Sequence, residues 1–502
     1  PGQAPGGQGV LRHVGAGASQ AQRTPVETVV REQPKIGRNE RVNIKNVTTG
    51  ESKIVKFKQA EPLIKSGRWV ITQSFFIFRQ TNVMEIYAAI LLWAIPAFLA
   101  LVVIEIFYGQ WKGKQTYSFM DTLSSLSSGM TNILKDLIGL TLVLISYPYL
   151  FDLLHLQTLE ATFWTYSIAF ICIDFASYWG HRLNHQVNLF WNQHIIHHSS
   201  EEFNLACALR QSFSNLVSLS ALFLIPAALL GVPHKVITIL ASIHLFGQFW
   251  YHTQHIGKLG WLEYILVTPS QHRVHHAINP EYIDKNLAAI FCVWDRWFGT
   301  FQEELDNIPP VYGTLKPVQS WNPFWINFQH LWSLSQDAWR TNKWTDKFKI
   351  WFMPTGWRPD DVAQSHPKKK VNSPFEQKKY KHKYSSFLKS YATFQFMGIT
   401  IMLLYFLSHF EDFDTPFRLA LVAILFLSIF SYTSVMDCFK WAALFDSFRA
   451  LTGIFFLLLP FHLFLWEFHW VFALFLSFYF GISLITSFWI AQASPARKLA
   501  LT

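Results

Sequence analysis

The chain has 502 residues, of which 51% are hydrophobic and 17% aromatic, including 47 Phe and 21 Trp. This composition excludes an ordinary soluble enzyme and indicates an all-α, polytopic membrane protein. The net charge of +10 does not indicate a nucleic-acid partner, because the basic residues lie in tails and in loops between apolar spans, where they orient a membrane protein.

The first 83 residues differ in composition from the rest of the chain. They are polar and basic, and residues 36–71 alternate apolar and polar side chains, which indicates a small β unit. Lys35 to Ile71 resembles the C-terminal tail of the translocase motor SecA. An apolar span begins directly after Met84. We therefore expect residues 1–83 to be a β-rich or disordered tail outside the native protein, which would begin at Met84.

Apolar stretches predict about nine transmembrane helices. Two of them are joined only by the short connection Gly231 to His234, which predicts an antiparallel hairpin. The nine stretches are residues 86–108, 137–154, 161–179, 212–232, 235–251, 391–410, 417–436, 448–466 and 470–491.

Charge and composition divide the chain after the tail into three parts. We expect a histidine-rich core over residues 84–310, a basic cytoplasmic linker region over 311–385 and a four-helix membrane region over 386–502. The basic run Pro367 to Lys383 marks the cytoplasmic face. Counting spans from it places the histidines in the cytoplasm, and we expect an integral protein of the bacterial inner membrane.

Three groups of closely spaced histidines lie between residues 181 and 276. On a helix, residues three and four apart share a face, so each group is expected to aim its imidazoles at one point. Imidazole suits iron, copper and zinc. Eight histidines are too many for the four ligands of one zinc, and two metal ions fit better. The groups are HRLNH (His181, His185), HIIHH (His194, His197, His198) and HRVHH (His272, His275, His276).

These motifs carry a family resemblance. HxxxH, HxxHH and a distal HxxHH around a hydrophobic hairpin resemble the fatty acid hydroxylase/sterol desaturase superfamily of membrane di-iron oxygenases. Within it, His197 to Ser212 and Thr268 to Phe301 resemble the ether-lipid-cleaving branch, alkylglycerol monooxygenase. The resemblance is dense from about Asp121 to Glu304.

The resemblance implies two iron ions, molecular oxygen and a lipid substrate. Hydroxylating the carbon next to the ether oxygen of an alkylglycerol gives a hemiacetal that releases a fatty aldehyde. Electrons would come from tetrahydrobiopterin or from another donor such as ferredoxin. The family motifs imply as ligands His181, His185, His194, His197, His198, His272, His275 and His276, with His252 as a ninth.

Other residues near the motifs are expected to support the metal ligands. Asp174 precedes His181 by two helical turns and is expected to accept the second N–H of a ligand imidazole. His255 is open between ligand, supporting residue and incidental neighbour. His244 could face the same cavity or be an ordinary hydrogen-bonded helix residue. Trp294 to Trp297 is expected to be a structural corner against the core.

Three residues are expected to hold a cofactor or reductant: Gln186, Asn204 and Arg210. For Asn204 and Arg210 the alternative is that they satisfy backbone groups at a helix start. Gln186 departs from the animal alkylglycerol monooxygenases, which commonly carry Glu after the second histidine. Losing that carboxylate puts dependence on tetrahydrobiopterin in doubt.

Two other functions compete with this interpretation. A hydroxylase or desaturase of sterols, carotenoids or aminolipids would use the same irons. A membrane metal transporter would use histidines for zinc or copper, but transport sites lie near the membrane midplane on broken helices, whereas these groups are predicted just past the ends of long helices.

Overall fold

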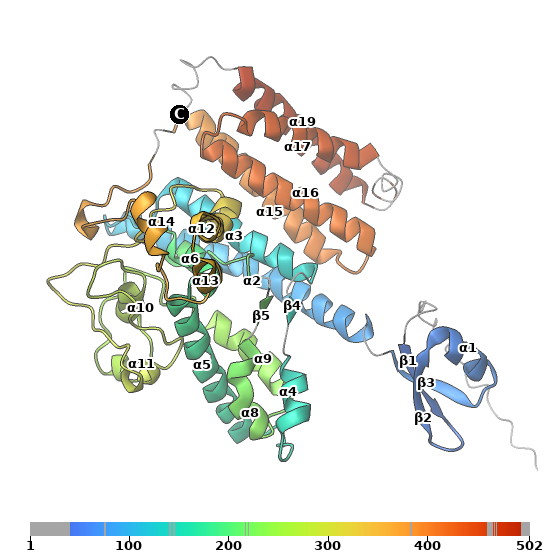
Figure 1. Cartoon of the computed structure of the whole chain (residues 1–502). Helices are drawn as coiled ribbons and strands as arrows, with labels where there is room; N and C mark the ends of the chain where they lie inside the picture. The colour runs from blue at the N-terminus through green and yellow to red at the C-terminus, as the bar shows by residue number, and fades with distance from the viewer. Residues whose placement is uncertain are drawn as a thin grey trace, which may run out of the picture. The chain divides into compact units, whose positions relative to one another are not determined.

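The computed structural model describes residues 41–74, 77–139, 142–143, 146–215, 217–218, 220–381, 384–458, 465, 467 and 469–492. The chain divides into two compact units, Pro1–Asn82 and Val83–Thr502. Figure 1 shows a small sheet with one helix in the first unit and mostly helices in the second.

The described part of the first unit is a three-stranded antiparallel sheet in the order β2-β1-β3. Its strands are β1 (Arg41–Asn46), β2 (Ser52–Lys56) and β3 (Trp69–Ser74), and α1 (Phe57–Lys65) connects the last two. Ile44, Ala60 and Trp69 form the core between the helix and the sheet. The predicted β unit is confirmed over these residues; α1 is an addition that the alternating pattern did not indicate, and residues 36–40 lie outside the described residues.

Four helices near the C-terminus pack against one another through a continuous apolar core. They are α15 (Ser386–Ser408), α16 (Thr415–Met436), α17 (Ala442–Leu458) and α19 (Trp470–Gln492). Side-chain caps start two of them: Ser385 accepts from the backbone N–H of Leu388, and Asp414 accepts from that of Phe417.

Four helices of the described residues are long and apolar enough to cross a membrane. They are Tyr87–Trp111 within α2 (Ile77–Trp111), Ser386–Ser408, Thr415–Met436 and Trp470–Ala491. The predicted spans at 86–108, 391–410, 417–436 and 470–491 are therefore confirmed as helices of sufficient length. The predicted count of nine spans is not confirmed.

Two of the predicted spans are wrong. Residues 137–154 are divided between the end of α3 (Phe119–Leu137), the short strand β4 (Leu142–Val143) and α4 (Tyr147–Leu154). Gly139 has a φ of 64°, and Ser146 caps a new helix, so no continuous helix forms. Apolar composition alone had suggested a span.

The second wrong span is 212–232. Its described residues contain the short strand β5 (Val217–Ser218), a 3-10 turn at Ser220–Leu224 and α8 (Ile225–Leu229). A polar side chain at its start is hydrogen-bonded to a distant part of the chain: the hydroxyl group of Ser212 donates to Oδ1 of Asn327. The expected turn at Gly231 is present, with a φ of 80°, and a Cβ there would lie 1.8 Å from the carbonyl oxygen of Gln157.

Two further predicted spans correspond to helices that are not among the four helices long and apolar enough to cross. α5 (Phe163–Gln186) includes residues 163–179 of the span expected at 161–179 but ends in the first histidine group. α9 (His234–Phe246) has 13 residues, about 20 Å at the α-helical rise. The span expected at 448–466 begins within α17 (Ala442–Leu458), and its residues 459–464 and 466 lie outside the described residues.

Candidate metal centre

Three helices and one loop position the histidines. The first group lies in the last two turns of α5, the second on α6 (Asn188–His198) and the third on α10 (Pro269–His275), whose cap is His276. His252 follows α9. The second and third groups therefore lie within short helices, not past the ends of long ones as expected. Asn188 anchors α6 by donating to the carbonyl oxygens of Ile350 and Trp357.

Nine histidines meet in two sets of ligand atoms, each set lying within 4.8 Å of one another. We call them the five-histidine group and the four-histidine group. The five-histidine group is His181, His185, His194, His198 and His275, and the four-histidine group is His197, His252, His272 and His276.

The division follows helix geometry in a way that the motifs did not predict. Each pair four residues apart, such as His194 and His198, stays in one group. The neighbour in the middle of the motif, His197, points instead to the other group, because adjacent helical residues face directions about 100° apart. The third motif divides likewise, with His275 crossing. The expectation that each motif aims at one point is therefore wrong for the second and third motifs.

Five of the nine imidazoles form a hydrogen bond through Nδ1 to a residue outside the two histidine groups, and this bond fixes the orientation of the ring. In the four-histidine group, Nδ1 of His197 and of His252 donate to the carbonyl oxygens of Arg210 and Gln248, at 3.3 and 3.0 Å. In a neutral imidazole, this leaves a lone pair on each Nε2. These two Nε2 atoms nevertheless lie 3.3 Å apart.

The same crowding of Nε2 atoms recurs in both groups. Nε2 of His194 lies 2.8 Å from that of His181 and 3.1 Å from that of His198. Nε2 of His272 lies 2.9 Å from that of His252 and 3.1 Å from that of His276. Converging acceptor atoms in a buried site are costly unless a cation lies among them. The donor set therefore fits metal ions.

The protonation of the histidines supports the same conclusion. Burial, with the neighbouring imidazoles adding to it, lowers the pKa of His181 and of His197 to about 3. It lowers the pKa of His194, His272 and His276 well below the ordinary value. Neutral imidazoles are the form that binds metal.

A loop after α10 holds three histidines of the five-histidine group from outside. The carbonyl oxygens of Lys285 and Leu287 accept from Nδ1 of His275 and His181, at 3.0 and 2.7 Å. The carboxylate of Asp284 lies 3.1 Å from Nδ1 of His185. Sequence reasoning missed Asp284. Its φ of 56°, unusual for a residue other than glycine, is visible only in the folded chain.

The corner at residues 294–297 fixes this loop. Asp295 is buried and accepts from the backbone N–H groups of Leu287 and Ala288, at 2.7 and 3.0 Å. The prediction of a structural corner on the core is confirmed for Trp294 and Asp295, which are buried, whereas Arg296 and Trp297 are exposed. The corner therefore sets the position of the carbonyl oxygen of Leu287, which orients His181.

Asp174 does not contact any of the nine histidines directly. Its buried carboxylate accepts from Nε2 of His244 at 2.7 Å, from the backbone N–H groups of Ile290 and Phe291, and from the indole of Trp294. The predicted partner is therefore wrong, and His244 is the hydrogen-bonded helix residue of the two alternatives.

His255 lies outside both groups. Its ring meets that of Tyr108 edge-on at 5.1 Å between centroids, and its buried Nε2 has no hydrogen-bond partner. Of the three alternatives left open for His255, the structure supports the incidental neighbour of the site.

Of the three residues expected to hold a cofactor, Asn204 and Arg210 have side-chain partners elsewhere. Asn204 caps the short helix α7 (Leu205–Ala208) and donates to the carbonyl oxygen of Thr116. Arg210 is buried and pairs with Asp121 at 2.8 Å. Gln186 is exposed at the end of α5. None of the three is among the described residues that line the cavity beside the histidines.

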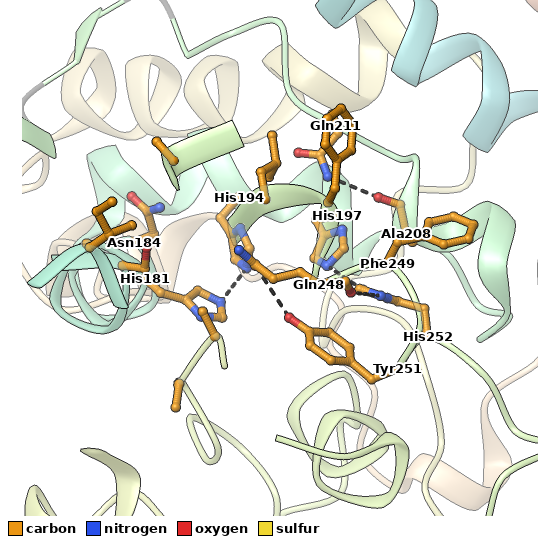
Figure 2. A pocket seen from close by; sticks show the side chains of 18 of the residues that line it. His181, Asn184, His194, His197, Ala208, Gln211, Gln248, Phe249, Tyr251 and His252 are labelled. Carbon is orange, nitrogen blue, oxygen red and sulfur yellow. Dashed lines mark hydrogen bonds between the residues drawn. The ribbon is translucent and has the colours of Figure 1, made fainter. Parts of the chain in front are cut away.

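A cavity of about 610 Å³ opens onto both histidine groups. His181 and His194 face it from the five-histidine group, and His197, His252 and His272 face it from the four-histidine group. Figure 2 shows four of these imidazoles around one space, those of His181, His194, His197 and His252. No Asp, Glu, Lys or Arg occurs among its described lining residues. The cavity is therefore suited to an uncharged, largely apolar ligand.

Histidine ligands beside an apolar cavity, in a chain with helices long enough to cross a membrane, define the class as a membrane-bound, metal-dependent lipid hydroxylase. Consistent with this, the fatty acid hydroxylase family model matches residues 166–300. The family is iron-dependent, and the two histidine groups fit a metal site.

Alkylglycerol monooxygenase from Homo sapiens is 35% identical to this chain over 364 residues, covering 71% of the chain and 80% of the relative. Alkylglycerol monooxygenase from Danio rerio is 39% identical over 271 residues, covering 53% and 59%. The chain belongs to the alkylglycerol monooxygenase family. It is an integral membrane protein and an oxygen-dependent monooxygenase.

The short tail resemblance is also confirmed. The protein translocase subunit SecA of Christiangramia forsetii is 56% identical over 59 residues, which are 12% of this chain and 5% of SecA. No solved structure matches the chain.

Proposed function

We propose that this protein holds two iron ions, one in each histidine group, and oxygenates the carbon next to the ether oxygen of an alkylglycerol. The observation that carries the proposal is the division of nine histidines into five and four ligands that face one uncharged cavity. The named relatives act on alkylglycerols, which supports the choice of lipid.

Irons bound in these groups would supply the activation of dioxygen and the oxidation of an unactivated C–H bond. In balance, one dioxygen, two electrons and two protons convert the methylene next to the ether oxygen into a hydroxymethylene, and the second oxygen atom leaves as water. The product is a hemiacetal. Its carbon–oxygen bond breaks to give a fatty aldehyde and glycerol.

The chain's own residues orient the ligands and exclude water. Backbone carbonyl oxygens hold Nδ1 of His181, His197, His252 and His275, so that each Nε2 faces inward. The apolar wall contains Phe98, Phe246 and Phe249. It favours an alkyl chain over water beside the histidines and limits access by bulk solvent.

We also propose that the centre faces the cytoplasm of a bacterium from its inner membrane. The basic run 367–383 precedes the span α15, and basic segments beside a span mark the cytoplasmic side. A cytoplasmic donor would then supply the electrons. We favour reduced ferredoxin over tetrahydrobiopterin, because Gln186 lacks the carboxylate common in animal relatives and charge-assisted hydrogen bonds are stronger than neutral ones.

The test uses purified full-length protein in lipid nanodiscs. Iron per chain is measured, and an alkylglycerol is supplied with oxygen and either reduced ferredoxin or titrated tetrahydrobiopterin. We expect two irons per chain and oxygen-dependent release of fatty aldehyde. Metal uptake without lipid oxidation would support transport instead, and oxidation of a sterol, carotenoid or aminolipid in place of the alkylglycerol would replace the substrate.

The choice of donor has its own variant. Gln186→Glu restores the carboxylate and is expected to tighten tetrahydrobiopterin binding by about 1–3 kcal/mol, or roughly 10- to 100-fold. Saturable pterin use by the wild type that does not change in this variant would contradict the argument.

A further inference from the structure

We propose that Asn184, Gln211 and Asn215 form a neutral amide subsite that binds the hydroxyl groups of an uncharged polyol head group. The proposal rests on the proposed function and deepens it, since it names the residues that distinguish one class of lipid from another. All three side chains line the cavity at the histidine groups.

One face of α5 lines the cavity and changes from apolar to polar along its length. The lining residues on this helix are Ile173, Ala176, Ser177, Gly180, His181 and Asn184. Their spacing of three and four residues places them along a single stripe. At the α-helical rise, Ile173 and Asn184 lie about 16 Å apart, with His181 between them and closer to Asn184. The stripe is apolar at one end and polar at the end nearest the ligands.

The lining residues of α9 and of the loop after it also change from apolar to polar toward the histidines. Ile237, Ala241 and Leu245 line the cavity at four-residue spacing, and Gln248 and His252 follow. The two helices lie side by side, since Asp174 on α5 contacts His244 on α9, and the C-terminal ends of both helices lead to histidines of the two groups. An alkyl chain between Ile173 and Ile237 would therefore place its first carbons at the histidines.

The amides lie next to the ligands. Asn184 follows His181 by three residues, and Figure 2 shows the two side chains on the same helix. Gln211 follows Arg210, whose carbonyl oxygen accepts from His197. Asn215 follows Ser214, whose hydroxyl accepts from Asn192 on α6. A carbon at the histidines would therefore have its head group within reach of these amides.

Hydrogen-bonding capacity is left over in this subsite. Oδ1 of Asn215 is buried and has no partner among the described residues. Gln211 uses one amide N–H, to the carbonyl oxygen of Ala208 at 3.0 Å, and no donor among the described residues binds its Oε1. Amides offer both donors and acceptors, and each hydroxyl group needs one of each. A glycerol diol matches the subsite.

The same subsite disfavours the head groups of aminolipids. No described lining residue is Asp or Glu, so the amine of an aminolipid would lose its hydration without gaining a carboxylate partner. Aminolipids should therefore bind poorly in this cavity.

The experiment compares an alkylglycerol with the alkyl methyl ether of the same chain length, which lacks the hydroxyl groups. KM is measured by turnover, and Kd is measured without oxygen, for wild type, Asn184→Leu and Asn215→Leu. We expect each variant to raise both constants for the alkylglycerol about 10-fold, with no rise for the methyl ether and unchanged iron content. Asn184→Ser, which keeps a donor and an acceptor, should recover part of the loss.

The control acts at the other end of the cavity. Ala241→Phe should shift the preferred chain length and leave the preference for diol over methyl ether unchanged. Equal effects of the leucine variants on both lipids would overturn the subsite. If the wild type oxidises no alkylglycerol, the proposed function fails. In that case a Kd preference for the diol that depends on Asn184 and Asn215 still supports the subsite, and its absence refutes it.

An independent observation carries a second proposal. α12 (Pro323–Arg340) buries one face, and Trp325, Trp332 and Trp339 are exposed on the other, the last with 86% of its surface accessible. Their seven-residue spacing forms one stripe. An exposed face of a helix in water is normally polar. This face therefore needs an apolar or half-apolar surrounding.

We infer that this stripe lies in the head-group layer of the same membrane. α12 begins at the C-terminal end of the span α16, where Asn322 donates to Ser434. The next helix, α13 (Trp344–Lys349), adds exposed Trp344 and Phe348 beside Lys343 and Lys347. Tryptophan with lysine is suited to the interface of a bilayer that contains anionic lipid.

Spin labels on cysteine variants in nanodiscs test the placement. A label at Trp332→Cys should collide more with oxygen than with a water-soluble nickel chelate, and more so with anionic lipid. A label at Asp306→Cys, where the side chain is 93% exposed, should show the reverse. Equal access of the nickel chelate to both labels would overturn the placement.

Discussion

Asp174 and His244 form a buried pair in which Nε2 of His244 donates to Oδ1 of Asp174 at 2.7 Å. The pair reaches the metal centre indirectly. Gln248 donates through its side chain to Nδ1 of His244, and its carbonyl oxygen accepts from Nδ1 of His252. The carboxylate thus orients a ligand of the four-histidine group through two intermediate residues.

Replacing this carboxylate should destabilise the core. Asp174→Asn brings an amide N–H toward four donors and leaves at least one of them unsatisfied, which costs about 1–3 kcal/mol. We expect a lower free energy of unfolding and reduced iron, measured by denaturation and metal analysis. Asp152→Asn, at an exposed position, is the matched control. Unchanged iron and stability would show that the carboxylate has no such role.

Single ligand variants should separate the two groups. His275→Ala removes a ligand from the five-histidine group and His197→Ala removes one from the four-histidine group. We expect each to reduce turnover by more than about 100-fold while the protein still inserts. Metal analysis should show partial iron loss in each. His255→Ala, outside both groups, should retain both irons, and equal loss in this control would contradict the assignment.

Asp284 should matter although it lies partly in solvent. Among the described residues, Asp284 is the one whose carboxylate contacts a histidine of either group. Its Oδ1 lies 3.1 Å from Nδ1 of His185. Removing such a partner typically costs 10- to 100-fold in metal affinity. We expect Asp284→Asn to weaken iron binding within about that range, measured by competition with a chelator. Glu281→Gln, on the same loop and exposed, should have no effect.

Arg210 should act on stability and not on use of the electron donor. Its guanidinium pairs with Asp121 and also donates to Ser125 and Ser199, all away from the cavity. Breaking one partner of a buried pair costs about 3–5 kcal/mol. Arg210→Gln and Asp121→Asn should each lower the free energy of unfolding, and the double variant should lose less than their sum. A change in KM for the donor with normal stability would instead support cofactor binding.

The first unit should be dispensable. A chain that begins at Met84 lacks the sheet and the SecA-like segment but keeps every histidine of both groups. We expect it to insert into membranes, retain its iron and oxidise lipid at the rate of the full chain. Membrane fractionation and metal analysis check this outcome. Failure of only the shortened chain to insert would make residues 1–83 part of the native protein.

The sequence by itself determined the local features of this protein. The histidine spacings predicted shared helical faces, and the pairs His181/His185 and His194/His198 do stay together. Uninterrupted apolar stretches predicted α15, α16 and α19. These features depend on residues close in the chain, whose relative positions follow from the helical repeat.

Only the tertiary structure decided which residues distant in the chain meet. It brought His275 to His181 and His197 to His252, gave Asp174 to His244 and Arg210 to Asp121, and interrupted the apolar run at 137–154. Such pairings join residues 70 or 89 positions apart. They arise because a buried polar group without a partner is costly, and neither composition nor helical periodicity identifies which partner it finds in the packed chain.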